Sequence, residues 1–216
     1  MKVRCVIYDC DGVLFDSLEA NGRLYNDLCM SVGRPPLNRE ELMYVHCHTV
    51  FESIHLMFKD DNGLERKALE LLKQVDFKQY IAFLKMEPHL IETLTTLKEK
   101  GILRVINTNR TTTMPFIMER FNLGPYFDMV VTALDVKNHK PHRESVDKIV
   151  DTLTLERNEV VFVGDSEVDR QTAESAGVRF IAYKNREILS DAYIDDHLDL
   201  LHLLPDGSGL QTHSSQ

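Results

Sequence analysis

Five short runs of apolar residues, rich in β-branched side chains, recur along this 216-residue chain, and each stops at polar or charged residues. Runs of this length without polar alternation are typical of strands buried on both faces. Apolar residues at helical spacing lie between the later runs, so these strands are expected to alternate with helices. This alternation predicts an α/β fold with a doubly wound parallel sheet. The runs are residues 3–8, 102–107, 129–132, 160–164 and 179–183.

The segment 17–86 interrupts this alternation. It contains no convincing buried strand, and apolar residues recur in it at helical spacing, as at Leu24 and Leu28. A crossover between parallel strands needs only about a dozen residues, so a segment of this length predicts a separate helical subdomain over the edge of the sheet. The expected parts are a Rossmann-like core (1–16 and 87–205), a small helical cap (17–86) and a frayed, flexible tail (206–216).

Composition limits the partners and the compartment. The chain has 34 acidic and 25 basic residues, a formal net charge of −9, and an acidic surface does not attract nucleic-acid backbones or anionic lipid. The sequence has no apolar stretch of about 18 residues that would span a membrane, and its first residues are too short an apolar run for a signal peptide. Cys5, Cys10, Cys29 and Cys47 form no C-x-x-C pair. We therefore expect reduced thiols in a cytoplasmic protein.

Two aspartates, Asp9 and Asp11, follow the first apolar run. Side chains alternate along a strand, so these two carboxylates are expected to point the same way. Neighbouring carboxylates at the mouth of an apolar sheet repel each other unless a cation or a proton compensates. Mg²⁺ is a natural partner, because it is a hard ion that takes oxygen ligands. Taken alone, the pair is equally consistent with solvated aspartates in a turn.

Polar residues also follow three other predicted strands. Thr108 and Asn109 follow the second run, Lys140 lies beyond the third, and Asp165 and Asp169 follow the fourth. Taken singly, Thr108 is typical of a helix N-cap, Lys140 of a surface charge, and the two aspartates of an acidic helix cap. Right-handed crossovers, however, bring the carboxyl ends of parallel strands to one edge of the sheet. We therefore expect all four sets to meet there.

The order and spacing of these four sets resemble the haloacid dehalogenase superfamily of phosphotransferases. The resemblance extends over essentially the whole chain, and the helical insertion after the first motif is similar to the cap of that family. Within the superfamily, the chain looks most like the group of phosphoglycolate phosphatase and β-phosphoglucomutase. The four motifs stand here as Asp9-Cys10-Asp11-Gly12-Val13, Thr108-Asn109, Lys140-Pro141 and Gly164-Asp165-Ser166-Glu167-Val168-Asp169.

This resemblance implies a Mg²⁺-dependent phosphatase that hydrolyses a small phosphate monoester, similar to phosphoglycolate or a sugar phosphate. In that reading Asp9 is the nucleophile that forms an aspartyl-phosphate, and Asp11 is the general acid and base. A β-phosphoglucomutase-like phosphosugar mutase is the alternative, since it uses the same motifs but returns the phosphoryl group to a reoriented intermediate. A non-catalytic regulatory module is the third reading. The implied partner is a small phosphorylated metabolite, and the implied assembly is a monomer or a homodimer.

The resemblance also implies the roles of the other motif residues. Thr108 and Lys140 would assist catalysis by holding the phosphoryl oxygens, and Lys140 together with Mg²⁺ would neutralise charge in the transition state. Asn109 would contribute its amide near the same oxygens. The implied metal ligands are Asp9, Asp11 through its backbone carbonyl, Asp165 and Asp169.

Three segments depart from the family pattern. Relatives often continue the third motif as Lys-Pro-x-Pro, but here Arg143 stands in place of the second proline, which affects the start of a helix and not the chemistry. Glu87-Pro88-His89 stands where relatives often have Pro-Gly, at a junction between core and cap. His46-Cys47-His48 stands where the cap commonly has a glycine-containing turn, so we expect a reshaped substrate cavity.

The cap is expected to select the substrate, but its sequence leaves the contacting residues open. Each candidate either faces the active site or lies on the solvated surface. The candidates are Arg23, Tyr25, Arg34, Arg39, His46, His48, His55 and Arg66.

Overall fold

The computed structural model of the protein describes residues 2–204, so the tail predicted at 206–216 lies outside the described residues. The strands of the main sheet are β1 (Cys5–Tyr8), β4 (Leu103–Asn107), β5 (Met129–Val131), β6 (Val160–Gly164), β7 (Arg179–Tyr183) and β8 (Ala192–Ile194). They pair in the order β5-β4-β1-β6-β7-β8, and every pairing is parallel. The predicted α/β fold is therefore confirmed, and β8 is a strand that the sequence did not predict.

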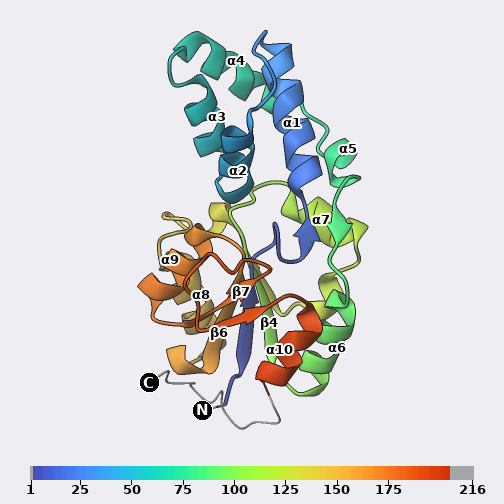
Figure 1. The fold of residues 1–216 in the computed structure, drawn as a ribbon, viewed down its shortest axis with the longest axis vertical. Helices are drawn as coiled ribbons and strands as arrows, with labels where there is room; N and C mark the ends of the chain where they lie inside the picture. The colour runs from blue at the N-terminus through green and yellow to red at the C-terminus, as the bar shows by residue number, and fades with distance from the viewer. Residues whose placement is uncertain (1, 205–216) are drawn as a thin grey trace.

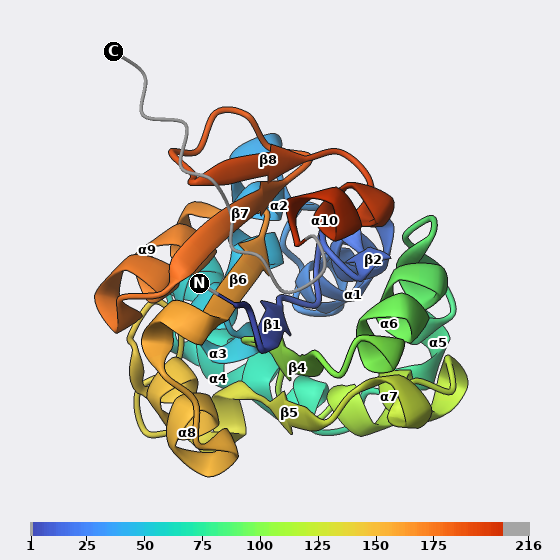
Figure 2. The ribbon, with the colours of Figure 1, turned by 90° about the horizontal axis from the view of Figure 1, so that it is seen from below.

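Helices cover both faces of this sheet (Figure 2). They are α6 (Leu90–Glu99), α7 (Met114–Arg120), α8 (Glu144–Leu153), α9 (Glu167–Ala176) and α10 (His197–Leu203), with short 3-10 helices η1 (Gly124–Tyr126), η2 (Ala133–Asp135) and η3 (Arg157–Glu159). Val6 and Tyr8 of β1 pack with apolar residues of α6, α7 and α10, whereas Cys5 and Ile7 pack with those of α8 and α9. Because both faces are buried, β1 shows no polar alternation.

The chain between β1 and α6 is mostly helical, as the apolar spacing predicted (Figure 1). Its elements are β2 (Phe15–Asp16), α1 (Leu18–Ser31), α2 (Arg39–Cys47), α3 (Val50–Phe58), α4 (Asn62–Leu72), α5 (Lys78–Ile81) and β3 (Lys85–Met86). Apolar residues of α1 to α4 form a cluster distinct from the two that flank the main sheet. This separation supports the proposed division into core and cap. Within residues 2–204, no helix is long and apolar enough to cross a membrane.

Two very short strands join these parts. Phe15 pairs with Met86 and Asp16 with Lys85 in an antiparallel ladder between β2 and β3. The chain therefore leaves the core and returns to it side by side. The sequence did not predict this ribbon.

A buried histidine, His197 of α10, ties the end of the described chain to the loop after β1. Its Nε2 donates a hydrogen bond to the carbonyl of Val13 at 2.8 Å, and its ring stacks on Tyr183 with centroids 4.6 Å apart. Its Nδ1 is buried and has no partner among the residues that the structure describes. Burial lowers the pKa of His197 to about 4, so the ring is neutral in the folded protein at neutral pH.

We expect this histidine to make the fold sensitive to acid. Between pH 6.5 and about 4 the unfolded chain binds a proton at His197 that the folded chain does not bind, so stability is lost as pH falls through that range. The loss from this group reaches about 2–3 kcal/mol at pH 4.5. Urea unfolding at pH 7 and pH 4.5 should show a smaller loss in His197→Phe than in the exposed-site control His202→Phe. Equal losses in the two variants would contradict this assignment.

Candidate active site

The motif residues meet at the carboxyl edge of the sheet, as expected for parallel strands. Asp9 follows β1, Thr108 follows β4 and Asp165 follows β6, and β1 lies between the other two strands. A cavity of about 580 Å³ opens at this edge beneath the helical insertion. The sequence-predicted residues that line it are Asp9, Asp11, Thr108, Asn109 and Lys140.

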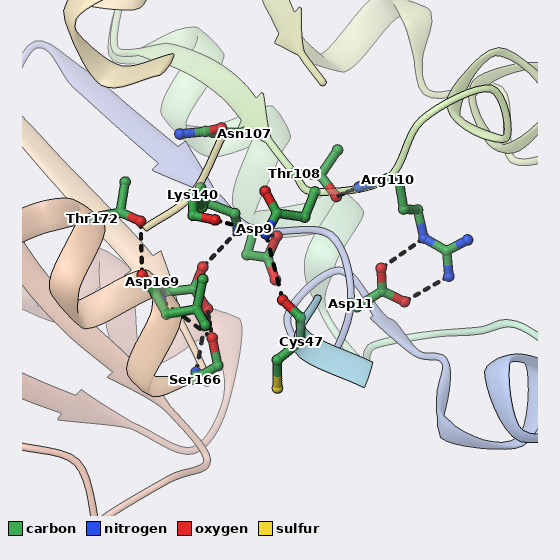
Figure 3. A network of polar contacts seen from close by, with 12 residues as sticks. Asp9, Asp11, Cys47, Asn107, Thr108, Arg110, Lys140, Ser166, Asp169 and Thr172 are labelled. Carbon is green, nitrogen blue, oxygen red and sulfur yellow. Dashed lines mark hydrogen bonds and ion pairs between the residues drawn. The ribbon is translucent and has the colours of Figure 1, made fainter. Parts of the chain in front are cut away.

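Lys140 links two aspartates in the interior of this site (Figure 3). Its Nζ donates to Asp9 Oδ1 at 2.7 Å and to Asp169 Oδ1 at 2.6 Å. Burial opposes the charge of the ammonium group, but the two carboxylates outweigh burial and raise the pKa of Lys140. Lys140 is therefore a buried, permanently charged group at this edge, and not the surface charge that its sequence context alone would suggest.

Three carboxylates gather around the same point. Oxygens of Asp9, Asp165 and Asp169 lie within 4.8 Å of one another. Burial, followed by repulsion from Asp169, raises the pKa of Asp9 to about 7. Burial and the neighbouring carboxylates also raise the pKa of Asp165 well above its ordinary value. A divalent cation would offset this concentrated negative charge, and a set of carboxylate oxygens is the ligand type that Mg²⁺ takes, so the residues present fit such an ion.

Two glycines let the chain approach these carboxylates. Gly12 has φ +73°, and a Cβ there would lie 1.9 Å from Asp165 Oδ2. A Cβ at Gly164 would lie 2.4 Å from Cβ of Asp169. Neither position can carry a side chain without displacing an acidic residue. The glycines in the first and fourth motifs are therefore part of the packing of the carboxylate cluster.

Asp169 is held from two sides. Besides Lys140, it accepts hydrogen bonds from the hydroxyl of Ser166 at 2.6 Å and from the backbone N–H of Ser166 at 3.2 Å. Ser166 is the N-cap of α9 and accepts in turn from the backbone N–H of Asp169. This reciprocal capping box fixes the first turn of the helix and thereby the position of a carboxylate that is fully buried.

Asp11 pairs with a different cation, Arg110, which the sequence analysis did not single out. Arg110 Nε donates to Asp11 Oδ2 at 2.7 Å and Nη2 donates to Oδ1 at 2.5 Å, a two-bond fork (Figure 3). Asn21 of α1 also donates to Asp11 Oδ1, at 3.2 Å. Burial would raise the pKa of Asp11, but Arg110 outweighs burial and holds that pKa below its ordinary value. Asp11 is therefore ionised in this arrangement.

The second motif also makes backbone contacts. Thr108 is buried, and its Oγ1 accepts from the N–H of Arg110 at 3.0 Å. It is not a helix N-cap, because the next helix, α7, begins at Met114. Asn109 Nδ2 donates to the carbonyls of Lys140 at 3.1 Å and Cys47 at 3.5 Å. Asn109 thus links the core to the end of α2, and its predicted contact with phosphoryl oxygens stays a prediction.

The structure separates the cap candidates into two groups. Tyr25, His46, His48 and Arg66 line the cavity. His46 Nε2 lies 3.9 Å from Asp165 Oδ2, across the boundary between insertion and core. Within residues 2–204, the remaining candidates lie outside the cavity lining, and three of them pair with acidic neighbours of the insertion. The pairs are Arg23 with Glu19, Arg34 with Glu41 and His55 with Glu65. Arg39 is the fourth candidate outside the cavity lining.

Comparison with known proteins agrees with this geometry. The family model described as haloacid dehalogenase-like hydrolase matches residues 6–183. A pyrophosphatase PpaX from Bacillus mycoides is 26% identical over 94% of this chain and 98% of its own length. A phosphoglycolate phosphatase from Rhodobacter capsulatus is 27% identical over 82% of this chain and 83% of its own length.

Solved structures of similar proteins share the fold of this chain. A haloacid dehalogenase superfamily hydrolase of subfamily IA from Geobacter sulfurreducens is 36% identical, with a TM-score of 0.77 over 94% of this chain and 97% of that one. A β-phosphoglucomutase from Clostridium difficile shares the fold, with a TM-score of 0.79 at 18% identity over 92% of this chain and 93% of that one. By its sequence, its fold and the residues at its sheet edge, the chain belongs to the haloacid dehalogenase-like hydrolase family.

Proposed function

We propose that the protein is a Mg²⁺-dependent phosphatase that hydrolyses a small phosphate monoester through an aspartyl-phosphate on Asp9. The observation that carries this proposal is the arrangement at the sheet edge. A buried aspartate lies beside a buried lysine and two further carboxylates, and a second aspartate lines the same cavity. A nucleophile, a cation site and an acid–base group are thus gathered at one place.

In the first step, an oxygen of Asp9 attacks phosphorus, and the bond from phosphorus to the ester oxygen breaks. The leaving oxygen takes a proton from Asp11, which acts as general acid. This step requires a protonated Asp11 and hence displacement of the Arg110 guanidinium. In the second step, ionised Asp11 takes a proton from water, which attacks the phosphorus and releases Asp9. The ionised, Arg110-bound form in this structure has the charge that the second step requires.

Lys140 and Thr108 would position the phosphoryl group. The ammonium group of Lys140 has three donors, and two of them go to Asp9 and Asp169, which leaves one for a phosphoryl oxygen. Thr108 lines the same cavity. Asp9, Asp165, Asp169 and the backbone carbonyl of Asp11 would hold Mg²⁺. When bound, the ion supplies positive charge that favours ionised Asp9 and offsets negative charge on the phosphoryl group.

We also propose that the insertion acts as a cap that excludes water during the first step. Contacts of Asn109 with Cys47 and of Asn21 with Asp11 join it to the catalytic edge. The proposed compartment is the cytoplasm and the proposed assembly a monomer or homodimer. Free thiols at Cys5, Cys10 and Cys29, all buried, support a reducing compartment.

Phosphate release from p-nitrophenyl phosphate tests the function and its metal. We expect turnover with Mg²⁺ and a loss of roughly 100-fold or more on chelation by EDTA. Mg²⁺ at about 100 times its dissociation constant should raise the melting temperature by roughly 5–10 °C. Asp165→Asn should lose this shift, whereas the exposed-site control Asp151→Asn should keep it. Full activity in EDTA would exclude a requirement for a metal ion.

The same assay separates the alternatives. A mutase would transfer phosphoryl groups between positions of a sugar phosphate and release little inorganic phosphate. A regulatory module would bind Mg²⁺ and turn over no ester in a broad panel of phosphorylated metabolites. Rapid phosphate release from at least one monoester is the result that supports the phosphatase.

Gly12→Ala should disrupt the proposed metal site in a protein that still folds. The new Cβ would overlap Asp165, while the positive φ adds backbone strain. Gly101→Ala is the matched control, because Gly101 has φ +71° and no described atom within 4 Å of its Cβ position. Both variants should lose about 1–2 kcal/mol of stability from the positive φ, and Gly12→Ala should lose more because Asp165 must move. We expect only Gly12→Ala to lose Mg²⁺ affinity and roughly 100-fold in kcat/KM, and equal kinetic losses would contradict the packing argument.

A further inference from the structure

The cavity at the sheet edge extends well beyond the space that a phosphoryl group would occupy. Its volume is about 580 Å³, and the carboxylates of Asp9 and Asp11 line one part of it. Apolar side chains of the insertion form much of the remaining wall, namely Leu24, Val45, Leu72 and Phe77. An ester with a very small leaving group would leave these apolar surfaces in contact with water.

Two exposed apolar side chains line this cavity, one on the insertion and one on the core. Phe51 on α3 is 55% exposed, and Leu134 in η2 of the core is 61% exposed. Both line the cavity. Large apolar groups that remain exposed around a concave site are typical of ligand-binding surfaces. Their positions on the insertion and on the core would let a ligand contact both parts of the molecule at once.

Several polar groups along this wall already have partners. His48 stacks on Tyr44, with ring centroids 3.8 Å apart, and its Nδ1 lies 2.9 Å from the Tyr44 carbonyl. Lys73 pairs with Glu70 at 2.7 Å, and Arg66 is exposed, so its charge stays in water. A sugar would need a hydrogen-bond partner for each hydroxyl that it buries, whereas an apolar group needs none.

We propose that this cavity is a leaving-group site for an apolar alcohol, so that the preferred substrates are alkyl or aryl phosphate monoesters larger than phosphoglycolate. The reaction rests on the proposed phosphatase function. The bond between phosphorus and the alkoxy oxygen breaks, and the alcohol leaves with one proton from Asp11. Water then supplies one oxygen and one proton to the released phosphate and returns its second proton to Asp11. The apolar alcohol lies against Phe51, Leu134 and the cap wall.

A series of n-alkyl phosphates from ethyl to octyl tests this site, because primary alkanols are nearly equal as leaving groups. We expect kcat/KM to rise about twofold to fourfold for each added methylene group until the cavity is filled. Phe51→Ser and Leu134→Ser should flatten this dependence. Met43→Ser is the matched control, since Met43 is 49% exposed on α2 and, within residues 2–204, lies outside the cavity lining.

Binding of n-alkyl phosphonates separates this inference from the proposed reaction, because their C–P bond is not hydrolysed. Affinity measured by titration calorimetry should rise with chain length in the parent protein and in Met43→Ser. If affinity rises but no ester is turned over, the apolar site stands and the phosphatase fails. If esters are hydrolysed without any dependence on chain length, or if phosphoglycolate and pyrophosphate are preferred, the apolar site is overturned and the phosphatase stands.

Discussion

Asp9→Asn is expected to lower kcat/KM for phosphate esters by roughly 10⁴-fold or more, because an amide oxygen is a poor nucleophile toward phosphorus. The substitution keeps the shape of the side chain and an acceptor for Lys140, which lies 2.7 Å from Asp9 Oδ1. Trapping with an acid quench should recover an acyl-phosphate from the parent enzyme and none from the variant. Undiminished turnover by Asp9→Asn would rule out a covalent mechanism through Asp9.

The same variant is expected to be at least as stable as the parent in metal-free buffer at neutral pH. Burial and neighbouring carboxylates raise the pKa of Asp9 from its ordinary value of 3.8 to about 7, so this group costs stability as pH rises between those two values, and the full penalty is present above pH 7. Replacing it with a neutral amide removes this penalty. Thermal unfolding in EDTA at pH 8 provides the measurement, with Asp151→Asn as the control. A marked fall in melting temperature would show that activity was lost through misfolding.

Lys140→Met should cause the largest loss of stability of any variant considered for this site. The side chain is 4% exposed and holds Asp9 and Asp169 together. Removing one partner from a buried ion pair leaves uncompensated charge and costs about 3–5 kcal/mol. Activity should fall as well, since Lys140 is proposed to hold a phosphoryl oxygen.

Urea unfolding in EDTA at pH 8 measures this loss. Lys148→Met is the control, because Lys148 is partly exposed and lies 3.9 Å from Asp135, and pairs of that kind contribute about 1 kcal/mol or less. The deficit of Lys140→Met should shrink as pH falls below about 7, since Asp9 and Asp165 have raised pKa values and take up protons there. If the stability loss of Lys140→Met does not change with pH, it comes from lost packing and not from unpaired charge, and this prediction is wrong.

The sequence was most informative where local pattern and burial coincide. Buried parallel strands such as β1 and β6 are continuous apolar runs, and their ends could be located within two residues. Strands β2 and β3 have two residues each, which is too short for any periodicity to be seen. Edge strand β8 has three residues, and its Tyr193 is partly exposed, so it lacks the apolar run that marked the others.

The contacts of Asp11 show what a sequence leaves hidden. Arg110 is 99 positions away from Asp11 and Asn21 is ten positions away, and neither stands in a motif that the sequence analysis used. One signal was available. Four aspartates were assigned to one buried edge with Lys140 as the single basic residue, and a second buried cation near a strand end would help to balance them. Arg110 directly follows the second motif and meets that requirement.

The short ribbon of β2 and β3 has a consequence for how such an enzyme can diversify. Facing residues of an antiparallel pair lie only about 4.5–5.5 Å apart, so the two ends of segment 17–84 meet at neighbouring points. A tight turn, or an unrelated insertion of any length, could close the same gap without altering the register of the six-stranded sheet. With the proposed roles of cap and core, substrate choice and phosphoryl chemistry could therefore be inherited separately, and exchanging this segment between relatives would be a direct route to new specificity.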